Sequence, residues 1–317
     1  MTGTQNEVFK TPVNKIRLFE HGAPGSQNLK LTRKYYTEDM PDGRVKHIVQ
    51  NITDPDIVPY IPDGIGNSTD RQRIPAVLII PGGAFRRLVY NFEGEDVAKW
   101  LNSMGIAAFV LECRLPSDEH DNAEDVPLID AMRAMRVIRG RAQEFGIDEA
   151  KIGVMGFSAG GFMAALLSTA YESDVYADYK YKDEYDKLSA RPDFAVCSYP
   201  VISIDDCIEA GKRYMSEEQV LERISDSAAK ILHKYNPDKL VRPDMPPVFI
   251  CETDDDRTTL SENSVGFYMA ARKAGVSAEL HIFRTGGHGY GCGDDFAQTG
   301  EWKVLFTKWI KSIGIIS

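Results

Sequence analysis

The chain has 317 residues, of which 43% are hydrophobic and 26% charged, and its formal net charge is −10 at pH 7. This composition is typical of a globular protein with a substantial core. The acidic balance argues against nucleic acids and anionic membranes as partners, because both require a clustered basic surface. We therefore expect a neutral small molecule as the ligand.

Neither a membrane span nor a secretory leader is visible in the sequence. No apolar stretch approaches the ~20 residues that cross a bilayer. The opening segment MTGTQNEVFK lacks a basic region followed by an apolar one. The five cysteines are scattered, without a Cys-x-x-Cys pair or a Cys/His cluster, so we expect buried free thiols and no metal site. Together these features predict a cytoplasmic protein.

Residues 1–75 are rich in Pro, Asn, Asp and Gly and contain short alternating pieces at 15–22 and 45–52. Alternation of apolar and polar residues is typical of a strand with one buried face. We expect this segment to form an antiparallel β-extension at one sheet edge rather than a separate domain. An exposed strand edge can pair with a second copy of the chain, so a homodimer is also a prediction.

From about residue 75 onward, short apolar runs alternate with helix-like stretches. This predicts a single α/β domain with a mostly parallel central sheet and helices on both faces. Continuously apolar runs suit strands that are buried on both faces. The expected strands are 76–81, 106–113, 151–157, 194–201, 247–252 and 278–283. The expected helices are 94–105, 127–146, 161–170, 261–275 and 300–314.

Two segments interrupt this alternation. Residues 172–193 are rich in tyrosine and charge, and we expect them to form a surface excursion. Residues 203–245 carry polar helical sequence between two expected core strands. Ligands bind at the carboxyl ends of the strands in open α/β sheets, so we expect the second segment to form a small helical cap there.

Ser158 lies in a Gly-Phe-Ser-Ala-Gly stretch between an expected strand and an expected helix. This context is that of a nucleophile elbow, in which a strained turn exposes a serine hydroxyl. Only residues without side-chain bulk fit two positions before and after such a serine. The helix that follows also directs its N-terminal dipole at developing negative charge. The alternative is a glycine-rich structural turn; we predict a nucleophile.

A nucleophilic serine needs a base and a group that orients the base. His288 lies in the glycine-rich loop FRTGGHGYGCG after the last expected strand, where small neighbours let an imidazole enter a cleft. Asp254, Asp255 and Asp256 follow the preceding expected strand. The order Ser, Asp, His along the chain is the one that α/β-hydrolases have. The residues leave the choice among the three aspartates open.

An oxyanion hole needs backbone N–H donors close to the serine. Gly82, Gly83 and Ala84 follow directly after the first buried strand, and Ala159 follows the serine. We expect the N–H groups of Gly83, Ala84 and Ala159 to hold the oxyanion. Gly82, Phe85 and Tyr90 are expected to border the substrate, together with the 203–245 insert.

With these residues in place, the chain resembles the α/β-hydrolases of the bacterial acetylesterase and xylan-esterase group. That group is related to dienelactone hydrolases and to hormone-sensitive-lipase-like esterases. The resemblance covers about residues 70 to 315. It rests on the segments 79–85, 97–116, 155–161, 188–203, 245–256, 261–275 and 279–291.

The resemblance implies hydrolysis of short acyl esters, notably acetyl groups on plant-cell-wall oligosaccharides, without a metal or an organic cofactor. Aligning on Glu-Asn-Ser at 262–264 places the triad acid at Asp256, beside Asp255. At position 252 this chain has glutamate where the group usually has histidine.

Two other functions share this core. A serine peptidase of the prolyl-oligopeptidase kind usually carries a large β-propeller, which residues 1–75 cannot build. A non-catalytic ligand-binding member generally loses the serine or the histidine, and this chain keeps both Ser158 and His288. The sequence therefore favours the esterase over both alternatives.

Overall fold

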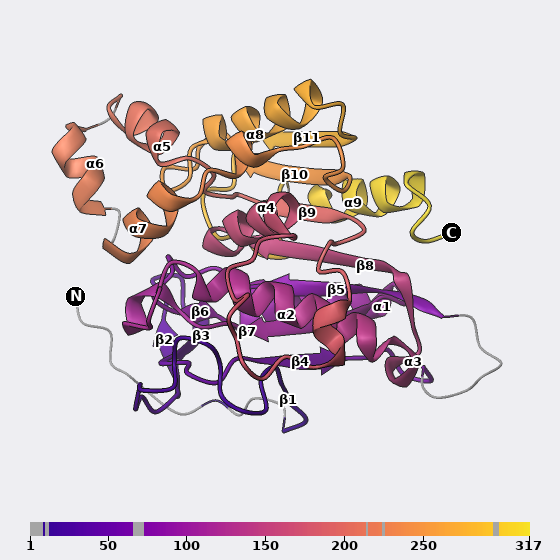
Figure 1. Ribbon diagram of the computed structural model, residues 1–317. Helices are drawn as coiled ribbons and strands as arrows, with labels where there is room; N and C mark the ends of the chain where they lie inside the picture. Colours follow the sequence, from indigo (N-terminus) through magenta and orange to yellow (C-terminus); the bar gives the residue numbers. More distant parts are fainter. Residues whose placement is uncertain (1–8, 10–12, 66–72, 214, 224–225, 294–297) are drawn as a thin grey trace.

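The computed structural model describes residues 9, 13–65, 73–213, 215–223, 226–293 and 298–317. Its main feature is a sheet with the strand order β1-β4-β7-β5-β8-β9-β10-β11 (Figure 1). Neighbouring strands from β7 to β11 run parallel, whereas β1 and β4 are antiparallel additions at one edge. The strands are β1 (Ile16–Arg17), β4 (Asp56–Tyr60), β5 (Ile74–Ile80), β7 (Ala107–Glu112), β8 (Ile147–Phe157), β9 (Ala195–Ser198), β10 (Val248–Thr253) and β11 (Ala278–Phe283).

The parallel sheet and the α/β class predicted from the sequence are confirmed. Each of the six expected apolar runs forms one strand of the parallel part. Strands β5, β7, β9 and β10 are buried almost throughout, because they have neighbours on both sides and helices above and below. Strand β11 differs from the expected two-sided burial. It lies at the free edge next to β10, and Ile282 is 41% exposed.

Helices cover the sheet in layers (Figure 1). Helix α2 packs against α4, while α1 contacts α9 through Trp100 and Trp302. The helix expected at 127–146 is divided, because Arg141 between α2 and α3 has non-helical dihedral angles (φ −102°, ψ 16°). The bounds are α1 (Asp96–Ser103), α2 (Val126–Gly140), α3 (Ala142–Phe145), α4 (Ala159–Ala170), α8 (Ser261–Lys273) and α9 (Glu301–Ser312).

A small second sheet lies beside the main one. Strands β2 (Lys34–Asp39) and β3 (Val45–Gln50) form an antiparallel hairpin. The short strand β6 (Leu88–Val89) adds to β3. Because β6 follows the glycine loop after β5, this pairing holds the hairpin next to that loop.

The 203–245 segment contains α5 (Ile204–Gly211), α6 (Glu217–Arg223) and α7 (Asp226–Lys234). In Figure 1 these helices stand away from the sheet, at the upper left. The 172–193 excursion instead lies against α2. There Arg133 is only 4% exposed, and its guanidinium donates to a carboxylate oxygen of Asp183 at 2.7 Å. A buried arginine paired in this way fastens the excursion to the core.

Candidate active site

Ser158 forms the bend between β8 and α4. Its dihedral angles, φ 54° and ψ −120°, lie in a region that residues with a side chain rarely adopt, at a cost of about 1–3 kcal/mol. A Cβ atom on Gly160 would lie 1.9 Å from the carbonyl oxygen of Ile80, and one on Gly156 equally close to that of Gly160. The two glycines that flank the serine are therefore required by close backbone packing at the bend.

His288 reaches this serine from the loop after β11. Its Nε2 lies 2.9 Å from Ser158 Oγ, and its Nδ1 lies 2.7 Å from Asp256 Oδ2. The glycines on both sides of the histidine, Gly287 and Gly289, have positive φ angles of 63° and 77°. The hydroxyl of Thr253 donates to the carbonyl of Gly287 at 2.9 Å. Left-handed glycines and this anchor give the loop the shape that aims the imidazole at the bend.

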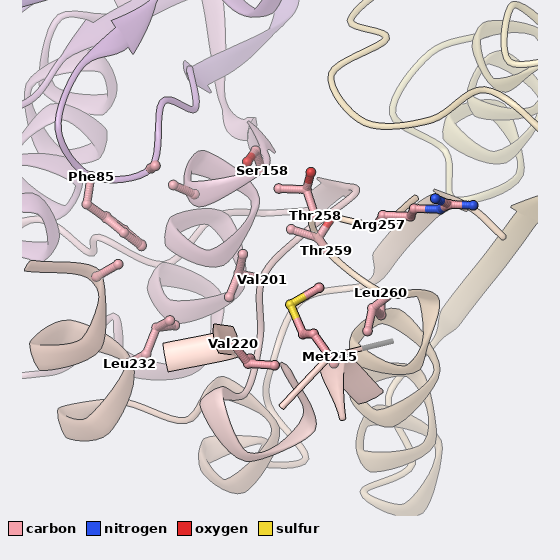
Figure 2. Close-up of a pocket in the computed structure, with 14 residues that line it drawn as sticks. Phe85, Ser158, Val201, Met215, Val220, Leu232, Arg257, Thr258, Thr259 and Leu260 are labelled. Atoms are coloured by element: carbon pink, nitrogen blue, oxygen red, sulfur yellow. The ribbon is translucent and has the colours of Figure 1, made fainter. Parts of the chain in front are cut away.

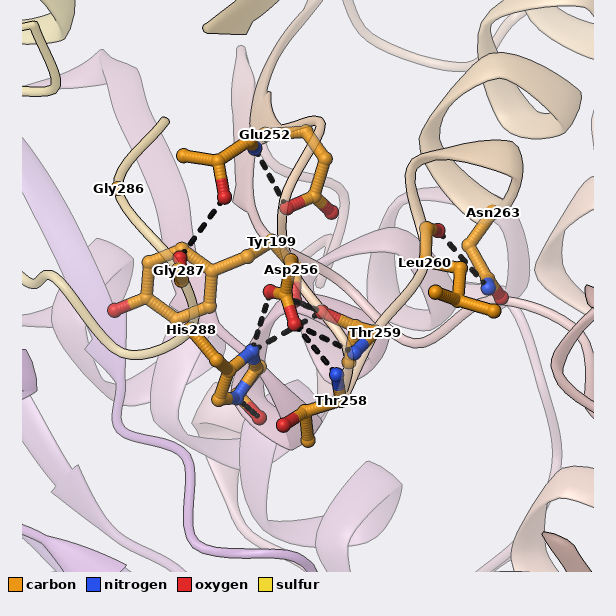
Figure 3. Close-up of polar contacts among 12 residues, drawn as sticks. Tyr199, Glu252, Asp256, Thr258, Thr259, Leu260, Asn263, Gly286, Gly287 and His288 are labelled. Atoms are coloured by element: carbon orange, nitrogen blue, oxygen red, sulfur yellow. Dashed lines mark hydrogen bonds and ion pairs between the residues drawn. The ribbon is translucent and has the colours of Figure 1, made fainter. Parts of the chain in front are cut away.

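The carboxylate of Asp256 is almost fully enclosed, with 1% of the residue exposed. It accepts hydrogen bonds from the backbone N–H groups of Thr258 (2.7 Å) and Thr259 (3.0 Å), and from the Thr259 hydroxyl (3.0 Å). Figure 3 shows these donors converging on Asp256 beside His288. Three donors therefore fix the orientation of the carboxylate towards the imidazole.

The neighbouring aspartates have different surroundings. Asp255 accepts from the N–H groups of Gly286 (2.9 Å) and Gly287 (2.8 Å), so it shapes the histidine loop without contacting the imidazole. Asp254 is exposed, and its backbone N–H donates to Phe283. Of the three candidates, the structure brings Asp256 alone into contact with His288.

Glu252 lies behind Asp256 and is fully buried. It accepts from the backbone N–H of Thr253 (2.9 Å) and the hydroxyl of Ser264 (3.3 Å). Burial, and next the negative charge of Asp256, raise the pKa of Glu252 well above its usual range.

The loop after β5 presents backbone N–H groups to the serine. Gly83 has φ 139°, and Ala84 and Phe85 are successive left-handed residues (φ 55° and 59°). A Cβ atom on Gly83 would lie 2.0 Å from the carbonyl oxygen of Arg87. In the part of the chain that the structure describes, the N–H groups of Gly83, Ala84 and Ala159 donate to no protein acceptor. Unpaired donors around a serine are what an oxyanion hole requires.

Glu93 was not anticipated from the sequence, and it ties this loop to the histidine loop. It is 4% exposed and accepts from the N–H of Gly82 (2.8 Å) and the hydroxyl of Tyr199 (2.9 Å). The same hydroxyl accepts from the N–H of Gly291 at 3.1 Å, and the Tyr199 ring packs edge-on against His288. Burial raises the pKa of Glu93, and the charges of His288 and Lys46 oppose that rise.

Two hollows meet at Ser158. The first, here called the apolar pocket, has a volume of about 210 Å³. Figure 2 shows Met215 and Val201 in the space below Ser158, so the 203–245 insert and the segment that follows β9 close the pocket. Its side-chain lining includes Phe85, Val201, Met215, Val220, Leu232 and Leu260.

The second hollow, here called the basic cleft, has a volume of about 550 Å³ and opens on the other side of the serine. Its walls come from the β2–β3 hairpin, the glycine loop and the histidine loop. The lining includes Arg44, Lys46, Gln50, Arg86, Arg87 and Phe92, with Ser158 and His288 at the inner end.

The three expected substrate neighbours are placed differently from one another. Phe85 lines the apolar pocket. Gly82 lines neither hollow, since its N–H is held by Glu93. Tyr90 also lines neither; it is 1% exposed, and its hydroxyl lies 3.1 Å from that of Tyr60. Sequence position alone could not distinguish an inward-facing tyrosine from a cleft wall.

The described residues contain no group of three or more His, Cys, Asp or Glu side chains that could hold a metal ion. Among the helices that the structure describes, none is both long and apolar enough to cross a membrane. Cys113, Cys197 and Cys251 are buried free thiols.

Comparisons with known proteins show which family and which relatives the chain resembles. The family model described as BD-FAE matches residues 65–270, more than half of the chain. An acetylxylan esterase from Xylanibacter ruminicola is 31% identical over 240 residues, which are 75% of this chain and 45% of that protein. The chain thus spans less than half the length of this curated relative.

Solved structures with the α/β-hydrolase fold are also similar. An acetyl ester-xyloside bifunctional hydrolase from Caldicellulosiruptor lactoaceticus is 34% identical, with a TM-score of 0.72 over 96% of this chain and 97% of that chain. A thermophilic esterase from Thermogutta terrifontis with butyrate bound is 25% identical, with a TM-score of 0.65 over 83% of this chain and 91% of that chain.

Proposed function

The chain belongs to the BD-FAE family, and from this premise we propose that it is a serine esterase that removes short acyl groups, foremost acetyl, from oligosaccharides such as acetylated xylan. The observation that carries the proposal is the continuous contact from Ser158 Oγ through His288 to Asp256, with distances of 2.9 and 2.7 Å. The name of the Xylanibacter ruminicola relative supports acetylated xylan as the substrate.

The proposed mechanism follows from these contacts. His288 Nε2 takes the proton of Ser158 as its oxygen attacks the ester carbonyl, and Asp256 stabilises the imidazolium that forms. The N–H groups of Gly83, Ala84 and Ala159 hold the oxyanion. The alcohol leaves with the proton from His288. Water, activated by the same imidazole, then releases the acid from the acyl-enzyme.

The two hollows support an assignment of the two halves of the substrate. The apolar pocket receives the acyl group, because burial of apolar surface is favourable there. The basic cleft receives the alcohol, whose sugar hydroxyl groups require polar partners. At about 210 Å³ the apolar pocket is larger than an acetyl group needs, so we expect longer acyl chains, such as butyryl, to be hydrolysed as well.

The test is release of acetate from acetylated xylan oligosaccharides and of p-nitrophenol from p-nitrophenyl acetate. We expect Ser158→Ala to fold normally and to lower kcat by about 10⁴-fold or more. A matched control is Ser277→Ala, at an exposed serine remote from the site, which is expected to keep wild-type rates. Near-native turnover by Ser158→Ala would remove the mechanism.

The peptidase and binding alternatives give different results in the same assays. A peptidase would cleave an aminoacyl-naphthylamide faster than the acetyl ester. A binding protein would turn over neither substrate. The homodimer and the cytoplasmic location remain predictions from the sequence.

A further inference from the structure

The basic cleft is positively charged, in contrast to the chain as a whole. Its lining contains Arg44, Lys46, Arg86 and Arg87, although the net charge of the chain is −10. The cations come from two separate elements. Two lie on or just before β3, and two lie in the loop between the oxyanion residues and β6.

The four cations differ in how far they are neutralised. Arg87 Nη1 contacts the two carboxylate oxygens of Glu38 at 2.6 and 2.8 Å, and Arg44 forms an ion pair with Asp42 at 2.8 Å. Neither the Lys46 nor the Arg86 side chain forms a hydrogen bond or an ion pair with the residues that the structure describes. These two charges are available to a ligand.

The one acidic side chain in the described lining, Glu93, interacts with the charge of Lys46 but compensates the cations of the cleft only in part. Its two carboxylate oxygens already accept from Gly82 and Tyr199, and burial raises its pKa. It faces the core and is 4% exposed. A ligand in the outer cleft therefore meets positive charge that is only partly compensated.

We propose that this cleft binds the carboxylate of an acidic sugar, so that the preferred substrate is an acyl ester on an oligosaccharide that carries a uronate. The proposal rests on the proposed esterase function, which places the alcohol in this cleft. A guanidinium presents a planar fork that matches a carboxylate, and an ammonium adds a point charge. Gln50, also in the lining, can bond to sugar hydroxyl groups. The substrate is then not the neutral molecule that the overall charge predicted.

The experiment compares two acetylated xylo-oligosaccharides of equal length, one with a glucuronate branch and one with a glucose branch instead. They differ by one carboxylate. We expect the wild type to have a kcat/KM for the uronate substrate about 5- to 20-fold higher, as is reasonable for one or two partly exposed charge contacts. Raising the NaCl concentration from about 10 mM to about 1 M should remove most of this preference, because salt screens exposed charges.

The variants Lys46→Gln and Arg86→Gln assign the effect to the cleft. Each should reduce the ratio of the two kcat/KM values, and the double variant should bring it close to one. Lys308→Gln, at an exposed lysine on α9, makes the same change in net charge and should leave the ratio unchanged. This control separates a local contact from long-range attraction of the substrate.

Several results would overturn the inference. These are equal kcat/KM values for the two substrates in the wild type, a preference that survives high salt, and an equal fall in the ratio for Lys308→Gln. A higher kcat/KM for an oligosaccharide with a sulfated branch than for the uronate substrate would also overturn the inference, because the cleft would then prefer an anion other than a carboxylate. Turnover of p-nitrophenyl acetate in the same preparations distinguishes these outcomes from failure of the esterase function itself.

Discussion

The two sides of Ser158 are built from different parts of the chain and have opposite chemistry. The apolar pocket is closed by the 203–245 insert and by residues 257–260, whereas the basic cleft is walled by the β2–β3 hairpin and by the loop that precedes β6. The serine itself stands on the central sheet between them. The bend is held by contacts among β5, β8 and α4, and the two walls are added to it from outside the alternating core.

This contrast separates two roles: the bend holds the reacting serine, and the walls contact the two halves of the substrate. The bend tolerates almost no change, because backbone carbonyls lie 1.9 Å from where a Cβ on Gly156 or Gly160 would be. The walls consist of side chains that can change without disturbing that packing. We therefore expect changes at the triad to affect all substrates equally, and changes in one wall to affect only one half of the substrate.

The largest effect is expected at Asp256, the acid of the proposed triad, and it should be the same for substrates that differ in their acyl group or in their alcohol. Asp256→Asn removes the negative charge behind His288 and favours the wrong tautomer of the ring, so kcat should fall by about 10⁴-fold for short and long acyl esters alike. Steady-state kinetics with p-nitrophenyl acetate and butyrate measures this.

Asp255→Asn is the matched control for that change. An asparagine oxygen can still accept from Gly286 and Gly287 as Asp255 does, so the expected loss is less than about tenfold. A loss at Asp255→Asn as large as that at Asp256→Asn would move the triad acid to the neighbouring residue.

A smaller and one-sided effect is expected in the apolar pocket. Met215 lines this pocket and is partly exposed, so Met215→Trp should fill space at little cost in stability. We expect kcat/KM for p-nitrophenyl butyrate to fall about tenfold relative to the acetate, the scale on which a hydrophobic pocket discriminates small apolar groups. The uronate preference should not change.

The control for the pocket is Met269→Trp. Met269 is 59% exposed on α8 and does not line the pocket. An equal loss of acetate and butyrate turnover in Met215→Trp, or a selective loss in Met269→Trp, would contradict the assignment of the acyl group to this side.

The smallest effect lies away from both sides, at His120, and concerns stability. His120 is 5% exposed, and its Nδ1 lies 3.0 Å from Ser26 Oγ, a hydroxyl that also accepts from Arg114 at 2.8 Å. Burial, and then the charge of Arg114, lower the pKa of His120 from 6.5 to about 4. Between these pH values the unfolded chain binds the proton more readily, so stability falls as the pH drops from 6.5 towards 4.

His120→Gln should remove this contribution, so its Tm should decline less than that of the wild type over this pH range. The comparison with the variant is needed because burial raises the pKa of Asp118 to about 6. Protonation of that carboxyl acts in the opposite direction as the pH falls. Parallel Tm curves for wild type and variant would show that His120 does not titrate as described. Ester turnover measured at pH 7 should not differ.

Much of the core could be predicted because its signals are local. A buried parallel strand must be apolar throughout, and such runs placed all six strands from 76–81 to 278–283. The glycines around Ser158 carry a steric requirement that is visible in five consecutive letters. The split of the 127–146 helix at Arg141 was missed although Gly140 directly precedes it, because a single glycine inside a helical pattern is tolerated and does not by itself predict a break.

Other features of the site had no local signal. In the sequence, Glu93 is one acidic residue at the start of a polar helical segment. Its side chain points into the core because it accepts a hydrogen bond from Tyr199, which is more than a hundred residues away. The three consecutive aspartates are the same residue type and cannot be distinguished by local sequence. They differ only because Thr258 and Thr259 donate to one of them and the histidine loop donates to another.

The sequence by itself determined the sheet, the strained bend and the identities of the nucleophile and base candidates, because short-range sterics and burial dictate those residues. Among the three aspartates, the family resemblance pointed to Asp256, and the contact with the imidazole itself comes from the tertiary structure. Tertiary structure alone decided how Glu93 joins two loops and where the basic residues gather. These contacts depend on distances between segments far apart in the chain. Hydrophobic periodicity is a local pattern and does not determine such distances.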